Sequence, residues 1–139
     1  MPYRRALVLV VLAASLSACS SHTPDRDQAL SMTRSAISFA AESELFIDAI
    51  RQQRTTRRYA EGHLEYLADA VRQSTLDLDR AVPTPDAVRA AGECRVQVAL
   101  LLRELAGIRA ALGDDTALAA ARNRLGKIRT SLQHTASAL

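Results

Sequence analysis

Two cysteines and three histidines are the side chains with which this chain of 139 residues could perform nucleophilic, metal or redox chemistry. The histidines, His22, His63 and His134, lie far apart in the sequence. No glutamate is followed three residues later by histidine, which excludes the ligand pattern of di-iron carboxylate bundles. The Cys-x-x-Cys-His sequence that attaches c-type haem is missing, and no cluster of nitrogen and sulfur ligands suggests a zinc site. We therefore expect no metal centre.

Nucleophilic catalysis has little support elsewhere in the chain. Cys94 stands in a regular apolar pattern, where a thiol acts as a small hydrophobic group or, alternatively, forms a disulfide with another chain. The nucleophile sequence Gly-x-Ser-x-Gly and the glycine patterns of nucleotide-binding loops are absent. Carboxylate pairs such as Glu42 with Glu44 are two residues apart and point to different faces of a helix. We therefore expect that the protein is not an enzyme.

The other cysteine, Cys19, ends an N-terminal export signal. Arg4 and Arg5 precede an apolar run over residues 6–16, and small residues follow it. This order of a basic, an apolar and a small-residue segment is that of a bacterial signal peptide. The apolar run would span about 16 Å as a helix, about half of the hydrocarbon thickness of a membrane, so we do not expect it to cross one permanently.

The end of this signal, Leu16-Ser17-Ala18-Cys19, resembles the lipobox of bacterial lipoproteins. The resemblance implies that residues 1–18 are cleaved off and that Cys19 receives two or three acyl chains, enough for stable anchoring. In Gram-negative lipoproteins, Asp after the cysteine commonly retains the protein in the inner membrane, whereas this chain has Ser20 and Ser21. We therefore expect an anchor in the outer membrane, with the domain facing the periplasm.

Cleavage would leave a mature chain of 121 residues, the size of one domain. Residues 19–23 would form the lipidated cysteine and a short tether, and residues 24–139 the folded domain. The loss of two arginines with the signal leaves 16 basic against 15 acidic residues. This nearly balanced charge excludes the basic surface that a nucleic-acid-binding domain needs. Because the lipid occupies Cys19, Cys94 has no partner for a disulfide within its own chain.

The sequence of the domain favours helix throughout, because Ala, Leu, Arg and Gln abound and alternating β-branched residues are missing. Two Thr-Pro-Asp sequences, at 23–25 and 84–86, each supply an N-cap hydroxyl, a proline suited to the first helical turn and an acidic side chain. Gly113 followed by Asp114 ends one helix and begins the next. Apolar residues recur at steps of three and four, as in Cys94, Val98, Leu101, Leu105 and Ile108.

These signals predict an all-α fold, a four-helix up-down-up-down bundle with helices at about 24–52, 57–82, 85–112 and 115–138. The segment 51–58 interrupts the apolar pattern without Gly or Pro, so two interpretations remain: a turn at about residues 52–56, or one long bent helix followed by a helical hairpin. Displacing the sequence by 61 residues aligns apolar positions of the two halves, which favours two similar hairpins. Their similarity is either a duplication or the result of equal packing constraints.

Met32 and His134 would lie at the same end of an up-down-up-down bundle. This arrangement resembles the soluble b-type cytochromes with four helices, whose haem iron takes a methionine from the first helix and a histidine from the last. The resemblance implies a haem-binding bundle as an alternative function. Without haem, Met32 would fill space in the core, and His134 would be half-exposed near the C-terminus.

Four arginines, Arg51, Arg54, Arg57 and Arg58, fall near the predicted turn at one end of the bundle. They could bind the carboxylates of peptidoglycan or an acidic protein partner, or they could form a solvated turn. Taken together, the signal, the helical domain and the missing catalytic patterns predict a membrane-anchored periplasmic lipoprotein. We expect it to act as a non-catalytic interaction or structural module of the cell envelope.

Overall fold

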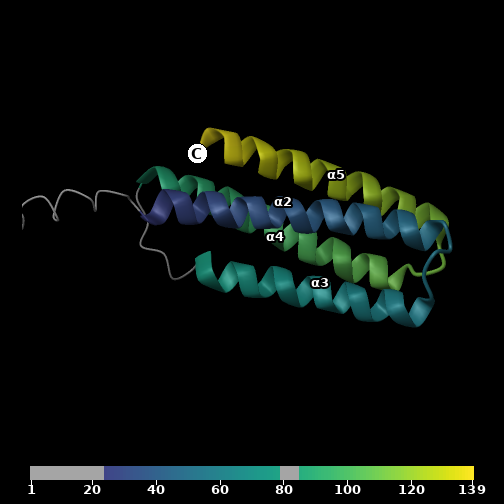
Figure 1. Cartoon of the computed structure of the whole chain (residues 1–139). Helices are drawn as coiled ribbons and strands as arrows, with labels where there is room; N and C mark the ends of the chain where they lie inside the picture. Colours follow the sequence, from purple (N-terminus) through teal and green to yellow (C-terminus); the bar gives the residue numbers. More distant parts are fainter. Residues whose placement is uncertain (1–23, 79–84) are drawn as a thin grey trace, which may run out of the picture.

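The computed structural model describes residues 24–78 and 85–139, which form four helices (Figure 1). The helices are α2 (Pro24–Arg51), α3 (Arg57–Leu78), α4 (Pro85–Ala110) and α5 (Asp115–Ala138). No strand occurs in these two segments. The predicted all-α four-helix bundle is therefore confirmed. The expected signal peptide, Cys19 and the tether lie outside the described residues, as do residues 79–82 of the predicted second helix.

A turn at residues 52–56 separates α2 from α3, so the alternative of one long bent helix is wrong. The hydrogen bonding of α2 closes with a bond donated by Gln52 N (3.0 Å), and Gln53 then takes a left-handed backbone conformation with a φ of 55°. The hydroxyl of Thr56 accepts a hydrogen bond from Tyr59 N at 3.3 Å and so caps α3. The chain thus turns with a glutamine and a threonine where the sequence offers neither Gly nor Pro.

The turn between α4 and α5 follows the signals seen in the sequence. Gly113 has a φ of 107°, a conformation that favours glycine, and Asp114 has extended dihedral angles (φ −102°, ψ 98°). A carboxylate oxygen of Asp114 accepts a hydrogen bond from Ala117 N at 3.0 Å and caps α5. α4 ends at Ala110, earlier than the predicted end at 112, because residues 111–113 already form the turn that leads into the left-handed glycine.

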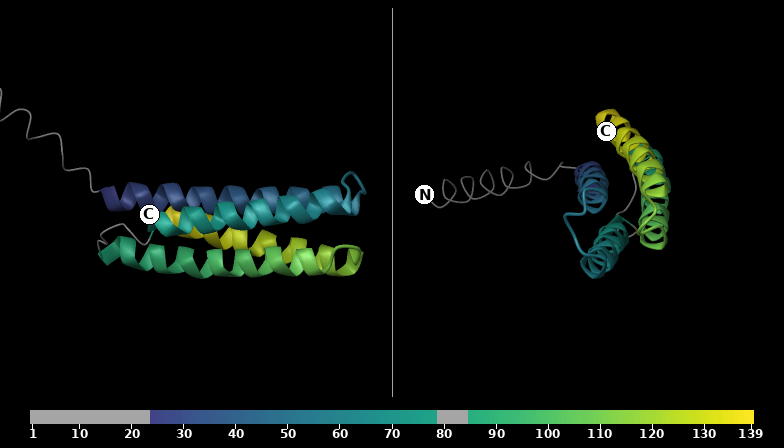
Figure 2. Two further views of the ribbon diagram at one scale, coloured as in Figure 1. Left: turned by 90° about the horizontal axis from the view of Figure 1, so that it is seen from below. Right: turned by 90° about the vertical axis from the view of Figure 1, so that its right-hand side faces the viewer.

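Successive helices run in opposite directions, so both short turns lie at one end of the bundle (Figure 1). The beginnings of α2 and α4 and the ends of α3 and α5 share the other end, as the view from below also shows (Figure 2). α2 packs most extensively against α5 and also contacts α4, whereas α3 makes no close approach to α5 within the described residues. The bundle is therefore flattened, with α2 and α4 across its short diagonal.

The core combines small residues along most of α2 with large aliphatic residues on the other helices and with Ile47 near the end of α2. Ala29, Ala36 and Ala40 are buried along one face of α2, which lets its backbone approach its neighbours closely. Leucines and isoleucines fill the remaining space, and each contributes about 1.5–3 kcal/mol through burial. The largest fully buried ones are Ile47, Leu64, Leu67, Leu101, Leu105, Ile108, Leu125 and Leu132. No buried side-chain nitrogen or oxygen of the described residues lacks a hydrogen-bond partner.

Candidate interaction surface

Three arginine–carboxylate pairs join α2 to α5 at the edge of the core. On α2 they use Glu44, Asp48 and Arg51, which are three or four residues apart and therefore share one face of the helix. The pairs are Arg129 Nε with Glu44 Oε1 (2.6 Å), Arg122 Nε with Asp48 Oδ1 (2.7 Å) and Arg51 Nε with Asp115 Oδ1 (2.7 Å). They specify the register of the two helices, because a shift of one helix would separate each charge from its partner.

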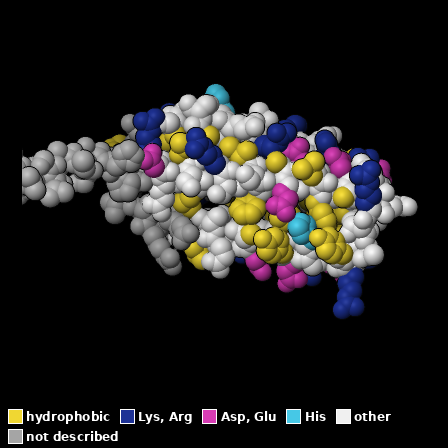
Figure 3. All heavy atoms as spheres, in the orientation of Figure 1, with side chains coloured by type: hydrophobic (Ala, Val, Ile, Leu, Met, Phe, Trp, Pro, Cys, Tyr) yellow, Lys and Arg dark blue, Asp and Glu magenta, His cyan; other side chains and the backbone are white. Residues whose placement is uncertain are grey.

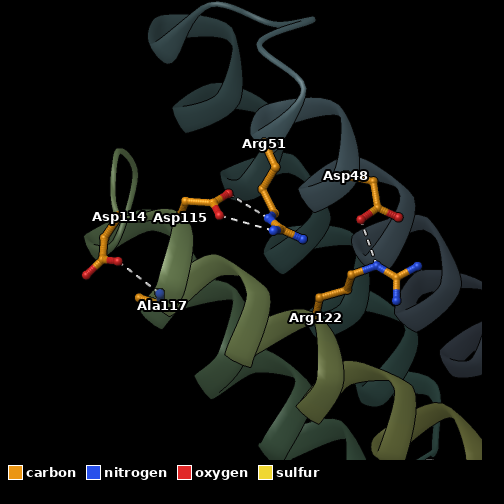
Figure 4. A network of polar contacts seen from close by, with 6 residues as sticks. All are labelled: Asp48, Arg51, Asp114, Asp115, Ala117 and Arg122. Carbon is orange, nitrogen blue, oxygen red and sulfur yellow. Dashed lines mark hydrogen bonds and ion pairs between the residues drawn. The ribbon is translucent and has the colours of Figure 1, made fainter.

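Figure 4 shows how this series ends at the start of α5. Arg51 points from the end of α2 to Asp115, the first residue of α5, while the neighbouring Asp114 turns to the backbone of Ala117. Hydrogen bonding to Asp115 raises the pKa of Arg51, and the same contact lowers the pKa of the Asp115 carboxyl. Arg51 is therefore a structural residue that attaches one turn of the bundle to the other.

The four arginines near the first turn have different surroundings. Arg51 is paired across helices, and Arg57 Nε donates a hydrogen bond to Glu61, one turn further along α3 (3.1 Å). The side chains of Arg54 and Arg58 are exposed and have no ion-pair partner among the described residues. Anion binding by these four arginines stays a prediction, and Arg54 and Arg58 are the two that no carboxylate of the described residues already pairs.

Met32 and His134 are the residues considered for haem ligation. Met32 lies near the start of α2 and His134 near the end of α5, so both are toward the end of the bundle opposite the two turns. The side chain of Met32 is half-buried and that of His134 is exposed. The buried residues on either side of His134 are Leu132 and Thr135, so the histidine lies off the face of α5 that meets the core. Neither Met32 nor His134 belongs to the core cluster of the described residues. Haem ligation by this pair stays a prediction.

Cys94 is buried in the core, as its place in the apolar pattern predicted. Its side chain lies beside Thr33 of α2 and is 2% exposed. Burial raises the pKa of the thiol, and this keeps the sulfur protonated and unreactive. Cys94 therefore acts as a small apolar residue between α2 and α4.

Four aromatic rings lie together between α2 and α3, and we call them the ring cluster: Phe46, Tyr59, His63 and Tyr66. His63 is at the centre, with ring-centroid distances of 4.3 Å to Phe46, 5.8 Å to Tyr59 and 5.9 Å to Tyr66. The rings of Tyr59 and His63 are almost parallel, with 8° between their planes. The three residues of α3 are spaced by four and three, so the helix itself places them on one face.

Glu42 on α2 adds a carboxylate to the ring cluster. Its Oε1 lies 3.3 Å from Nε2 of His63, which is mostly covered, whereas Tyr59 and Tyr66 are 60% and 62% exposed. Figure 3 shows this side of the molecule: a histidine lies among hydrophobic side chains over α2 and α3, acidic side chains adjoin them, and Lys and Arg lie toward the margins. The ring cluster and Glu42 thus form an exposed surface that is both aromatic and acidic.

Sequence reasoning missed the ring cluster, although part of the signal was present. The spacing of Tyr59, His63 and Tyr66 is that of neighbours on one helix face. Phe46 and Glu42 could be added only once the turn at residues 52–56 was known, because that turn determines which part of α2 faces α3.

No known protein family, no curated protein and no solved structure matches this chain. None of the helices in residues 24–78 and 85–139 is both long and apolar enough to cross a membrane. Nor do these residues contain a group of three or more His, Cys, Asp or Glu side chains that could hold a metal ion.

Proposed function

We propose that this chain is a bacterial lipoprotein anchored in the outer membrane through Cys19, and that its bundle is a non-catalytic interaction module facing the periplasm. The sequence Leu16-Ser17-Ala18-Cys19, at the end of a basic and then apolar segment, is the observation that carries the proposal. Acyl chains on the cysteine would hold the domain at the membrane without a transmembrane helix.

The arrangement of the bundle supports an interaction role. α2 begins at the end opposite the two turns, so a tether on Cys19 would enter the bundle at that end. The ring cluster lies toward the turn end, about 30 Å along α2 from Pro24. The exposed Arg54 lies in the turn and the exposed Arg58 in the first turn of α3. Side chains suited to a partner would thus be held away from the protein's own membrane.

Metabolic labelling with a fatty acid tests the anchor. The wild-type chain should incorporate the label and fractionate with the outer membrane, and Cys19→Ser should do neither. Cys94→Ser is the matched control, because it replaces the other cysteine at a buried position and should keep the label. A wild-type chain that takes up no label would contradict the proposal.

A further inference from the structure

We propose that the ring cluster and Glu42 form a docking site for a basic segment of a protein partner, in which an arginine or lysine side chain lies against the tyrosine rings and meets the carboxylate of Glu42. The proposal names the partner chemistry of the interaction module described above. It rests on that proposed function for its periplasmic setting, while the surface itself is defined by contacts within the bundle.

Aromatic side chains are concentrated at this surface, where Tyr59 and Tyr66 are exposed and the partly buried Phe46 also packs against the core. The chain has five Phe and Tyr residues; Tyr3 lies in the N-terminal segment, and three of the other four belong to the ring cluster. Leu45, next to Phe46 in the sequence of α2, is 71% exposed, which adds exposed apolar area to this helix. Tyrosine is enriched at protein interfaces, where Tyr and Arg are among the side chains that contribute most to binding. The composition of the surface therefore suits contact with a protein.

Glu42 supplies a negative charge that no arginine or lysine of the described residues neutralises. Its ionic contact is with His63, which is charged only when protonated. By contrast, Glu44 and Asp48 on the same helix are each bound by an arginine of α5. Glu42 is 47% exposed, so a cation from another molecule can reach its carboxylate. This unneutralised charge selects a cationic partner and disfavours an anionic lipid surface.

The position of Glu42 among the rings suits the recognition of a guanidinium group. A cation is attracted to the face of an aromatic ring when it lies within about 6 Å of the ring centroid. Glu42, Tyr59 and Tyr66 all adjoin His63, so one cation seated over the cluster would be close to a tyrosine ring and to the carboxylate. Arginine combines a planar group that stacks on rings with donors for a carboxylate, and so fits this surface better than lysine does.

Tyrosine fluorescence can report binding directly, because the chain has no Trp and its only tyrosines besides Tyr3 are the two in the ring cluster. The mature lipidated protein, purified in detergent, is titrated with an amidated alanine-rich peptide that carries four arginines. We expect a saturable change with this peptide and none with the same peptide carrying glutamine instead of arginine. Glu42→Gln should weaken binding about fivefold or more, and so should Tyr66→Leu, with Tyr59 as the remaining reporter.

Glu61→Gln is the matched control for Glu42→Gln. Glu61 is similarly exposed and lies on the same helix as three of the rings, but it is two residues from His63 and therefore on another side of α3. This variant should bind the arginine peptide as the wild type does, and circular dichroism should show that all variants are folded.

Three results would overturn the proposal. They are no response to the arginine peptide, equal responses to the arginine and glutamine peptides, and full binding by Glu42→Gln. If the arginine peptide gives no response, a response to N-acetylglucosamine oligomers would identify a sugar-binding surface instead. Acyl labelling is measured separately from fluorescence, so a failure of the anchor can be distinguished from a failure of this docking site.

Discussion

Arg51, the last residue of α2, and Asp115, the first residue of α5, form two hydrogen bonds of 2.7 and 3.1 Å although 64 residues separate them in the sequence. The contact joins the end of the first helix, α2, to the beginning of the last helix, α5. Both residues adjoin a turn, so the pair connects the two turns at the same end of the bundle (Figure 4). An arginine that the sequence suggested for partner binding is thus used to close the bundle.

The Arg51–Asp115 pair should make stability depend on pH in the acid range. Arg51 lowers the pKa of Asp115 from its ordinary value of 3.8, so the folded state favours the charged carboxylate. The stabilisation is therefore complete above about pH 4 and is lost as the pH falls through the lowered pKa. Asp115→Asn should melt at a lower temperature than the wild type at about pH 6, and the difference should vanish at the acid end of the range.

Thermal melts followed by circular dichroism over this pH range would test the pair. A difference between Asp115→Asn and the wild type that stays constant at all pH values would show that the charge of Asp115 does not matter.

The pair of Glu44 and Arg129 should contribute more to stability than an exposed pair. The Glu44 side chain is 10% exposed, and Arg129 donates hydrogen bonds to both of its carboxylate oxygens (2.6 and 3.4 Å). Arg129→Met keeps the aliphatic stem but leaves a largely buried carboxylate without its partner. We expect a loss of about 1–3 kcal/mol in the free energy of unfolding, measured with denaturant.

Arg57→Met is the matched control for Arg129→Met. Arg57 and Glu61 form an exposed pair within α3, with side chains 75% and 41% exposed, so its loss should change stability by less than about 0.5 kcal/mol. Equal effects of the two substitutions would show that burial does not strengthen the contact of Glu44.

The fold could be predicted from the sequence because its signals are local. Gly113 and Asp114 act through their own backbone and capping preferences, and the apolar steps from Cys94 to Ile108 follow from helix geometry alone. The position of the first turn was harder to predict, because Gln53 takes a left-handed conformation that is uncommon for glutamine. The register between α2 and α5 could not be read from the sequence, since it depends on pairs as distant as Glu44 and Arg129.

The candidate site was predictable only in part for the same reason. Arg51 and Arg58 have the same residue type and lie in the same segment, yet Arg51 is held by a carboxylate of a distant helix and Arg58 has no ion-pair partner among the described residues. Composition cannot distinguish these two situations. Glu42 and His63 likewise become neighbours only because the first hairpin closes with one particular register.

Two glycines of the second hairpin should respond to alanine in opposite ways. Gly113 has a φ of 107°, which an L side chain rarely adopts, so Gly113→Ala should lower the free energy of unfolding by about 1–3 kcal/mol. Gly107 lies within α4, and an added Cβ would meet nothing within 4 Å. Gly107→Ala should therefore stabilise the protein by about 0.5–1 kcal/mol. Denaturant unfolding measures the change in the free energy of unfolding for both variants. A loss for Gly107→Ala equal to that for Gly113→Ala would contradict the argument from backbone conformation.

The thiol of Cys94 should be unreactive until the bundle opens. It is 2% exposed and its pKa is raised by burial, so both access and the thiolate fraction are low. A thiol reagent added to the native protein at mildly alkaline pH should therefore react far more slowly than with a free cysteine, and denaturant should restore the ordinary rate. Fast reaction in the native state would show that α4 separates readily from its neighbours.

The final extent of the same reaction also tests the lipid anchor. The chain has two cysteines, and acylation consumes the thiol of Cys19 but leaves that of Cys94. The unfolded protein purified from membranes should therefore titrate with one thiol per chain. Cys94→Ser purified in the same way should titrate with none, because its remaining cysteine carries the lipid. A second thiol in the wild-type protein, or one in Cys94→Ser, would mean that Cys19 is not modified.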